Sequence, residues 1–189
     1  LVAAGAYTDS AGNSNEVSNT FDWTYDGTAP TMVITSDTVA SGATTATAAV
    51  VLIYTSSETT TDFVIGDITE TDCTTDSFTG SGTVYGSTCT VSADSTPTVL
   101  VAAGAFSDAY GNTNGAASNT YTWTQDDTGP TMTITSNTVD SGSSTNTGAV
   151  VLIYTSNEVT TDFILADITV TDCTNAEFTG SGAVYGSTC

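Results

Sequence analysis

Short runs rich in Val, Ile, Thr, Tyr and Phe alternate along the whole chain with clusters of Gly, Ser, Asn and Asp. The runs recur about every ten residues, which is typical of the strands and turns of a β-sandwich, and no helical period competes with them. The central part of the chain is therefore predicted to hold seven strands, at 32–35, 49–55, 63–69, 76–79, 84–92, 98–106 and 118–124.

An internal repeat organises the sequence. The segment LVAAGAYTDSAGN, from Leu1, returns as LVAAGAFSDAYGN, from Leu100, and VVLIYTS, from Val50, returns from Val150. Between them, FDWTYDGTAPTMVITS returns as YTWTQDDTGPTMTITS from Tyr121. The offset is 99 residues at first and 100 after one inserted residue. The chain is therefore predicted to be all-β, with tandem sandwiches of about 100 residues each.

The repeat divides the chain into three predicted parts. Residues 1–29 hold the last two strands of one module, 30–129 a complete module, and 130–189 the strands of a module up to part of the fifth, without the last two. Each terminal part alone would expose an open sheet face and unpaired edges. Two explanations fit: a covalent array whose neighbouring repeats complete both ends, or a protomer whose leading strands enter the incomplete sandwich of the next copy. Both predict a filament of copies or adjoining repeats.

Comparison of the two copies indicates which residues face the core. Met32 and Ile34 return as Met132 and Ile134, whereas Val33 becomes Thr133. A period of two then places Met32 and Ile34 in the core. The other predicted core anchors are Trp23, Trp123, Phe63, Phe163, Ile68 and Ile168.

The charge of the chain excludes whole classes of function. Its 189 residues include 21 Asp and Glu but no Lys, Arg or His, which gives a net charge of -21. Binding to nucleic acid or to an anionic bilayer is therefore not expected. Histidine-activated nucleophiles, Schiff-base lysines, P-loops and lysine isopeptide cross-links are also excluded. The longest apolar stretch, 48–54, is far shorter than the roughly 20 residues of a membrane helix, so no membrane insertion is expected.

Several motifs together resemble the bacterial immunoglobulin-like repeats of large surface adhesins. They are TSSETTTDFVIGDITETDC, FTGSGTVY, VAAGAFSDAYGN and the linkers DGTAPT and DDTGPT. The resemblance implies immunoglobulin-like (Ig-like) sandwiches outside the cell or on its surface, often with calcium stiffening the joints, and no catalysis. The paired cysteines are a departure, since the generic repeat does not require them.

Acidic residues recur where an Ig-like chain path would bring three segments to one pole. Strand one begins at that pole, and the loops after strands two and six return to it. Hard Ca²⁺ ions prefer oxygen ligands, so a calcium site is predicted at each joint. The first set is Asp26, Glu58, Asp62 and Asp108; the second is Asp126 or Asp127, Glu158, Asp162, and Asp9 from a neighbour. The alternative is that these acids only keep the surface soluble or cap turns.

Cysteines occupy matching places in the two copies. Cys73 and Cys89 are 16 residues apart, as are Cys173 and Cys189. Four cysteines allow three connectivities, and the local one is favoured because each pair can face across an antiparallel hairpin. Disulfides would indicate an oxidising compartment. The alternative, buried free thiols, would indicate a reducing one.

These observations favour a non-enzymatic structural and adhesive module that forms a rod or fibril. The alternative is a carbohydrate- or ice-binding module, and a carboxylate glycosidase is a third class that the once-per-module recurrence of the acids disfavours. About a third of the residues are Thr or Ser, so covalent O-linked glycans are a further expectation, at 41–47, 59–61 and 141–147. The alternative is that Thr simply fills the solvent face of strands and Ser the loops.

Overall fold

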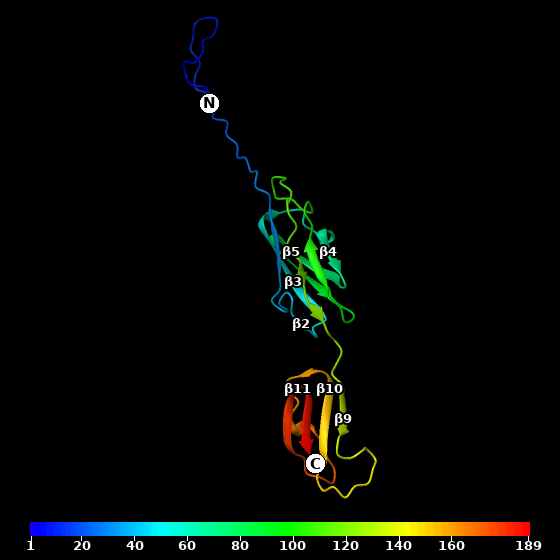
Figure 1. The fold of residues 1–189 in the computed structure, drawn as a ribbon. Coiled ribbons are helices and arrows are strands. Elements are labelled where there is room, and N and C mark those ends of the chain that lie inside the picture. Colours follow the sequence, from blue (N-terminus) through cyan, green and yellow to red (C-terminus); the bar gives the residue numbers. More distant parts are fainter. The chain divides into compact units, whose positions relative to one another are not determined.

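The computed structural model describes all 189 residues, which form two compact units, Leu1–Asp127 (unit 1) and Thr128–Cys189 (unit 2). Both units consist of strands, and the only helical turns are two short 3-10 segments, η1 (Ile65–Asp67) and η2 (Leu165–Asp167) (Figure 1). No helix has the length and hydropathy of a membrane span. The all-β fold class predicted from the strand spacing is therefore confirmed.

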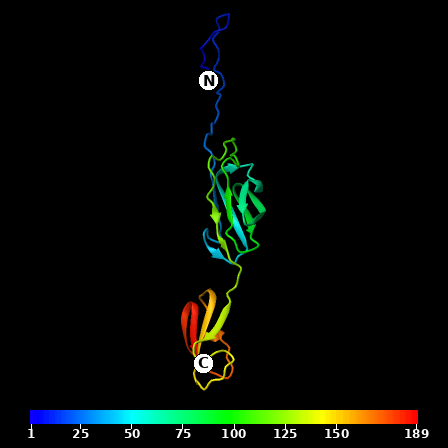
Figure 2. The ribbon, with the colours of Figure 1, turned by 45° about the vertical axis from the view of Figure 1, so that its right-hand side comes forward.

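Unit 1 contains two three-stranded antiparallel sheets and a short parallel pair. In the first sheet, β3 lies between β1 and β5, and in the second, β6 lies between β4 and β7. Figure 2 shows the strands of unit 1 gathered into one body, coloured mainly cyan to green. The parallel pair joins β2 to β8. The strands are β1 (Met32–Thr35), β2 (Thr44–Thr45), β3 (Ala49–Thr60), β4 (Ile68–Thr71), β5 (Thr74–Thr90), β6 (Thr98–Val101), β7 (Tyr121–Thr122) and β8 (Thr124–Gln125).

The core of unit 1 collects residues from both sheets. Met32 and Ile34 are only 3% and 1% exposed, which confirms the inward face predicted for β1. Phe63 stands at the centre of an aromatic cluster, with ring centroids 5.1 Å from Tyr85 and 5.5 Å from Phe106. These contacts join segments far apart in the sequence: β5, the loop between β3 and η1, and the turn after β6.

Several predicted strands differ in the structure. Predicted strand 63–69 begins only at Ile68, because the Asp67 carboxylate accepts the Val64 N–H at 2.8 Å and closes η1. Predicted strands 76–79 and 84–92 are one long element, β5, which reverses at a glycine turn. A Cβ on Gly80, whose φ is +114°, would lie 2.4 Å from the Val84 carbonyl oxygen, so this turn requires glycine. Predicted strand 98–106 ends at Val101, and 118–124 is reduced to β7 and β8.

Unit 2 is a single antiparallel sheet in which β10 (Val151–Thr160) lies between β9 (Met132–Ser136) and β11 (Ala176–Thr188). Residues 144–145 and 168–171, which match β2 and β4, form no strand here. In unit 1 these two strands pair only with β8 and β6. Unit 2 therefore has the fold of a module without its closing strands.

The inner face of this sheet is open. Met132 and Ile134 are 37% and 59% exposed, whereas the matching Met32 and Ile34 are buried. Phe163 is half-buried, whereas Phe63 is buried. Ile68 and Ile168 are both half-buried, so their prediction as core anchors is only partly met. The physical reason is that the second sheet, which covers the matching residues of unit 1, has no counterpart within residues 128–189.

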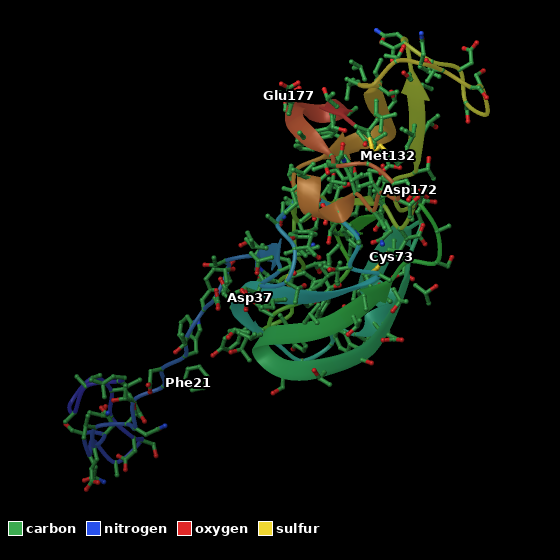
Figure 3. All side chains as sticks on the ribbon, turned by 90° about the horizontal axis from the view of Figure 1, so that it is seen from below. Phe21, Asp37, Cys73, Met132, Asp172 and Glu177 are labelled. Carbon is green, nitrogen blue, oxygen red and sulfur yellow. A yellow bond between two sulfur atoms is a disulfide. The ribbon has the colours of Figure 1, made fainter.

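Residues 1–25 form no strand, and their apolar side chains point into solvent. Trp23 is 77% exposed, whereas Trp123 is 1% exposed, so burial was predicted correctly for only one of the pair. Phe21 is equally exposed, on the segment labelled in Figure 3. The three-part division at residues 29 and 129 stays a prediction.

Candidate functional site

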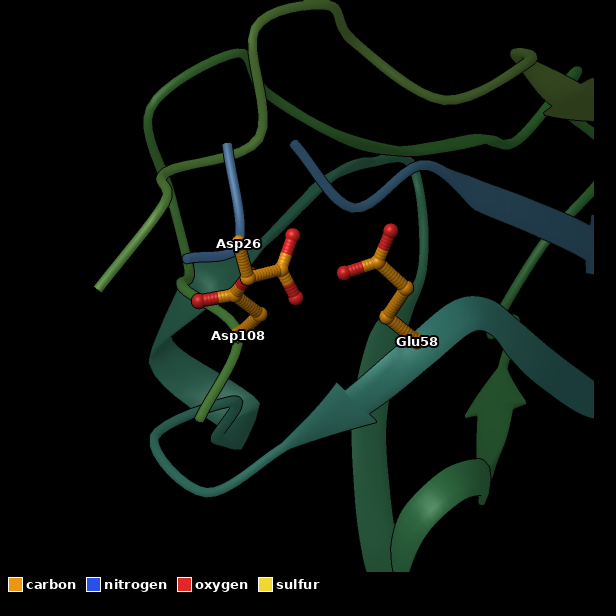
Figure 4. Close-up of side chains that lie close together, drawn as sticks. All are labelled: Asp26, Glu58 and Asp108. Carbon is orange, nitrogen blue, oxygen red and sulfur yellow. The ribbon is translucent and has the colours of Figure 1, made fainter. Parts of the chain in front are cut away.

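Three carboxylates meet at one pole of unit 1. One carboxylate oxygen from each of Asp26, Glu58 and Asp108 lies within 4.8 Å of the other two (Figure 4). Asp26 comes from the segment that enters the module, Glu58 from the end of β3, and Asp108 from the turn that follows β6. The predicted loop position of Glu58 is wrong, because β3 continues to Thr60.

Asp108 is buried and firmly held. The backbone N–H groups of Tyr110 and Asn112 each donate to Oδ1 at 2.8 Å, and the Asn112 side chain donates to Oδ2 at 2.8 Å. Desolvation raises the pKa of Asp108, but these donated hydrogen bonds outweigh it, so the pKa lies below its ordinary value. The same Asn112 amide donates to the Asp26 carbonyl oxygen at 3.2 Å, which joins the turn to the entering segment.

The charged form of Glu58 is destabilised in this cluster. Desolvation, followed by repulsion from Asp26 and Asp108, raises the pKa of Glu58 above its ordinary value. The chain has no Lys, Arg or His that could offset this repulsion. A hard divalent cation would do so, and an all-oxygen donor set suits Ca²⁺ rather than zinc, which prefers nitrogen and sulfur.

Asp62 is not part of this cluster. Both of its carboxylate oxygens accept the Ser107 N–H, at 2.9 and 3.1 Å. Asp62 therefore positions the turn that carries Asp108. The sequence predicted that it would join the other three carboxylates, but the structure does not group it with them.

The second predicted set is distributed over separate parts of the chain. Asp126 and Asp127 lie in unit 1, Glu158 and Asp162 in unit 2, and Asp9 in the N-terminal segment. Asp127 donates its backbone N–H to Asp94 Oδ1 at 2.7 Å. A side-chain hydrogen bond with Asp94 and the charge of Asp94 raise the pKa of Asp127. Sequence reasoning missed Asp94, because it lies in a segment, 90–99, that is present only once in the chain. The joint made by the second set stays a prediction.

Each unit contains one disulfide bond. Cys73 joins Cys89 with a Cα–Cα distance of 5.7 Å (Figure 3), and Cys173 joins Cys189 at 5.6 Å. These are the local pairs favoured by the spacing, and no cysteine is free. Disulfides are typical of oxidising compartments and indicate a non-cytoplasmic protein.

The two facing sheets of unit 1, the parallel end pair and the aromatic core define an Ig-like β-sandwich. Residues 26–124 match a protein family described as the bacterial Ig-like domain. This match covers more than half of the chain, and the chain belongs to that family. No curated protein and no solved structure matches it.

Membership of this family carries a general functional meaning. Bacterial Ig-like domains are structural modules that are typically found on the cell surface or outside the cell. The family is in general not enzymatic.

Proposed function

We propose that the chain is a segment of an extracellular rod or fibril built from Ig-like modules joined end to end. The observation that carries this proposal is the repeat itself: unit 2 has the strands that begin a module, and residues 1–25 have the sequence of those that end one. Such modules act mechanically, by holding an adhesive partner at a distance or by forming the fibre.

The proposed rod is stiffened by calcium at its joints. Asp26, Glu58 and Asp108 are the proposed ligands of the first joint, supported by their 4.8 Å grouping and by the raised pKa of Glu58. Calcium removes the repulsion among three carboxylates, and it ties the entering segment to the body of the module. Asp126 or Asp127, Glu158 and Asp162, with Asp9, are the proposed ligands of the next joint. We also propose that exposed Thr and Ser side chains carry covalent O-linked glycans, which would cover the surface of the rod.

The rod can be assembled by either of two routes. In a covalent array, the chain between two modules supplies the segment that corresponds to Thr90–Val99. In strand exchange, the closing strands come from another copy. Both routes place a finished sandwich at every joint.

A joined protein tests the rod without reference to strand exchange. Two copies of the 189-residue chain are connected through one copy of the Thr90–Val99 sequence, TVSADSTPTV, so that a covalent sandwich forms across the junction. Small-angle X-ray scattering and electron microscopy should show an elongated, stiff particle in calcium and a more flexible one in EDTA. A particle whose dimensions do not respond to calcium would reject the stiffened rod.

A carbohydrate-binding module is the second candidate, because Phe21 and Trp23 are exposed with ring centroids 6.0 Å apart. Exposed aromatic rings can stack on sugars. Glycan-array binding that disappears in Trp23→Ala would favour this function, and an empty array would leave the structural role as the only one.

A further inference from the structure

We propose that the outer face of the β1–β3–β5 sheet in unit 1 binds a second copy of the chain side by side, through the same face of that copy. This contact goes beyond the proposed rod, which joins modules end to end. The outer face consists of the side chains that alternate with core residues along the three strands. They are Val33 and Thr35 of β1, Val51, Ile53 and Thr55 of β3, and Val84, Gly86 and Thr88 of β5.

The strand register arranges these side chains in rows across the sheet. Thr55 pairs with Val33 on one side and with Val84 on the other, and the two valines are 50% and 51% exposed. In the next row, Ile53 pairs with Thr35 and with Gly86, which has no side chain. The outer face therefore has a raised row with two valines beside a row that is low at its glycine end.

No acidic side chain belongs to the outer face. The chain has 21 Asp and Glu and no Lys, Arg or His, so most approaches of one copy to another are repulsive. The acids of the three strands are Glu58, in the carboxylate cluster, and Asp76, on the half of β5 before the glycine turn. Two copies that meet through their outer faces keep these charges at the margins of the contact, where salt screens them.

Unit 2 carries the same face on β9, β10 and β11. The residues that recur are Thr135, Val151, Ile153, Thr155, Val184, Gly186 and Thr188, and Thr133 replaces Val33. One acid again lies before the glycine turn, here Glu177 instead of Asp76. Each chain therefore offers two uncharged faces, and a weak contact gains effective strength when both are engaged.

The chemistry of the outer face favours a second copy over other partners. A cationic partner gains no ion pair there and would bind the carboxylate cluster instead. A sugar finds no aromatic ring to stack on, because Tyr54 and Tyr85 of these strands are buried in the core. A second copy offers equivalent aliphatic side chains to bury, with no charge to desolvate. In a two-fold pair, the valine row of each copy lies over the low row of the other.

Matched variants test this contact on the full chain. Thr55→Glu combined with Thr155→Glu places a carboxylate in the middle of the outer face of each unit. Thr69→Glu combined with Thr169→Glu is the control, because it makes the same substitutions away from that face. Thr69 is an exposed residue of β4, in the other sheet of unit 1. Thr55 and Thr69 are both exposed, so both variants should fold, and circular dichroism checks this.

Sedimentation velocity measures the association over a range of concentrations. Salt at 0.5 M, about three times physiological ionic strength, limits the general repulsion between acidic copies. The wild type and the Thr69 variant should associate equally, and the dissociation constant of the Thr55 variant should be at least about tenfold higher, because like charges are brought together. A wild type that stays monomeric, or equal association of the two variants, would overturn the proposal.

Photo-cross-linking identifies the contact surface and does not depend on the folding of the glutamate variants. p-Benzoylphenylalanine at position 35, on the outer face, should cross-link to residues 32–60 or 84–90 of another copy, or to their counterparts in unit 2. The same probe at position 69 should give no such product. The proposal fails if position 35 gives no cross-link between copies. The rod is tested separately, by the dimensions of the joined protein in calcium, so either proposal can be rejected while the other stands.

Discussion

Asn119 makes two hydrogen bonds to the backbone of one residue, Ile34, and so pairs with the edge strand β1 as another strand would. Asn119→Ala would leave both backbone groups of Ile34 without this partner, at a cost of about 2 kcal/mol. Thermal melting of the full chain should show unit 1 unfolding earlier. Asn19→Ala is the matched control, which should leave the melting of unit 1 unchanged, and an equal loss in both variants would contradict the role of Asn119 in holding β1.

Gln125 is buried, and neither its side-chain oxygen nor its side-chain nitrogen has a hydrogen-bond partner. Removing a buried, unpaired amide avoids its desolvation penalty, so Gln125→Leu should stabilise unit 1 by about 1 kcal/mol. Urea unfolding measures this gain. Gln125→Ala serves as the comparison, since it removes the amide but also leaves a cavity, and it should be less stable than Gln125→Leu.

The Cys73–Cys89 disulfide closes a loop of 16 residues within unit 1. Replacing both cysteines by alanine should lower the free energy of unfolding by about 3 kcal/mol, because the unfolded chain without the cross-link has more conformational entropy. For a domain of this size, the melting temperature should fall by more than about 10 °C. The double variant should lose the response of unit 1 to a reducing agent; a response that persists would have to come from Cys173–Cys189.

Glu58→Gln should have opposite effects with and without calcium. In EDTA the substitution removes repulsion from Asp26 and Asp108, so the melting temperature of unit 1 should rise. In calcium it removes a charged ligand, and the affinity measured by calorimetry should fall at least about tenfold. Glu70→Gln, on β4 and outside the cluster, is the control that should change neither quantity.

The two shifted carboxylates give metal-free unit 1 a stability maximum in the acid range. The raised pKa of Glu58 means that the folded state binds its proton more readily, so stability rises as the pH falls through that pKa. The lowered pKa of Asp108 means that stability is lost as the pH falls further, through the folded pKa of Asp108. Melting in EDTA across this range should show the rise in wild type and not in Glu58→Gln.

The sequence was sufficient for features that depend on local period and chain path. Alternation placed Met32 and Ile34 inside, and the Ig-like order of strands brought Asp26, Glu58 and Asp108 to one pole. The burial of a residue that depends on contact with another segment was harder to predict. The predicted burial of Trp23 assumed a sheet that unit 1 provides only for Trp123.

Local turn chemistry accounts for the other differences. The Asp67 carboxylate caps a 3-10 turn where a strand was predicted, since aspartate side chains compete with strand hydrogen bonding. Asp62 was taken for a ligand because its position is acidic in both copies, yet in unit 1 its two oxygens hold one backbone N–H. Residue type alone does not distinguish an aspartate that positions a loop from one that is offered to a cation.

The Cys73–Cys89 disulfide also limits how far unit 1 can extend when it is pulled. The cross-link prevents the residues between Cys73 and Cys89 from extending under force. At about 3.4 Å each, these residues represent roughly 50 Å of contour length. When unit 1 unfolds under load, its length should therefore increase by less than that of a reduced chain. A force probe should measure the difference as a longer unfolding step after reduction.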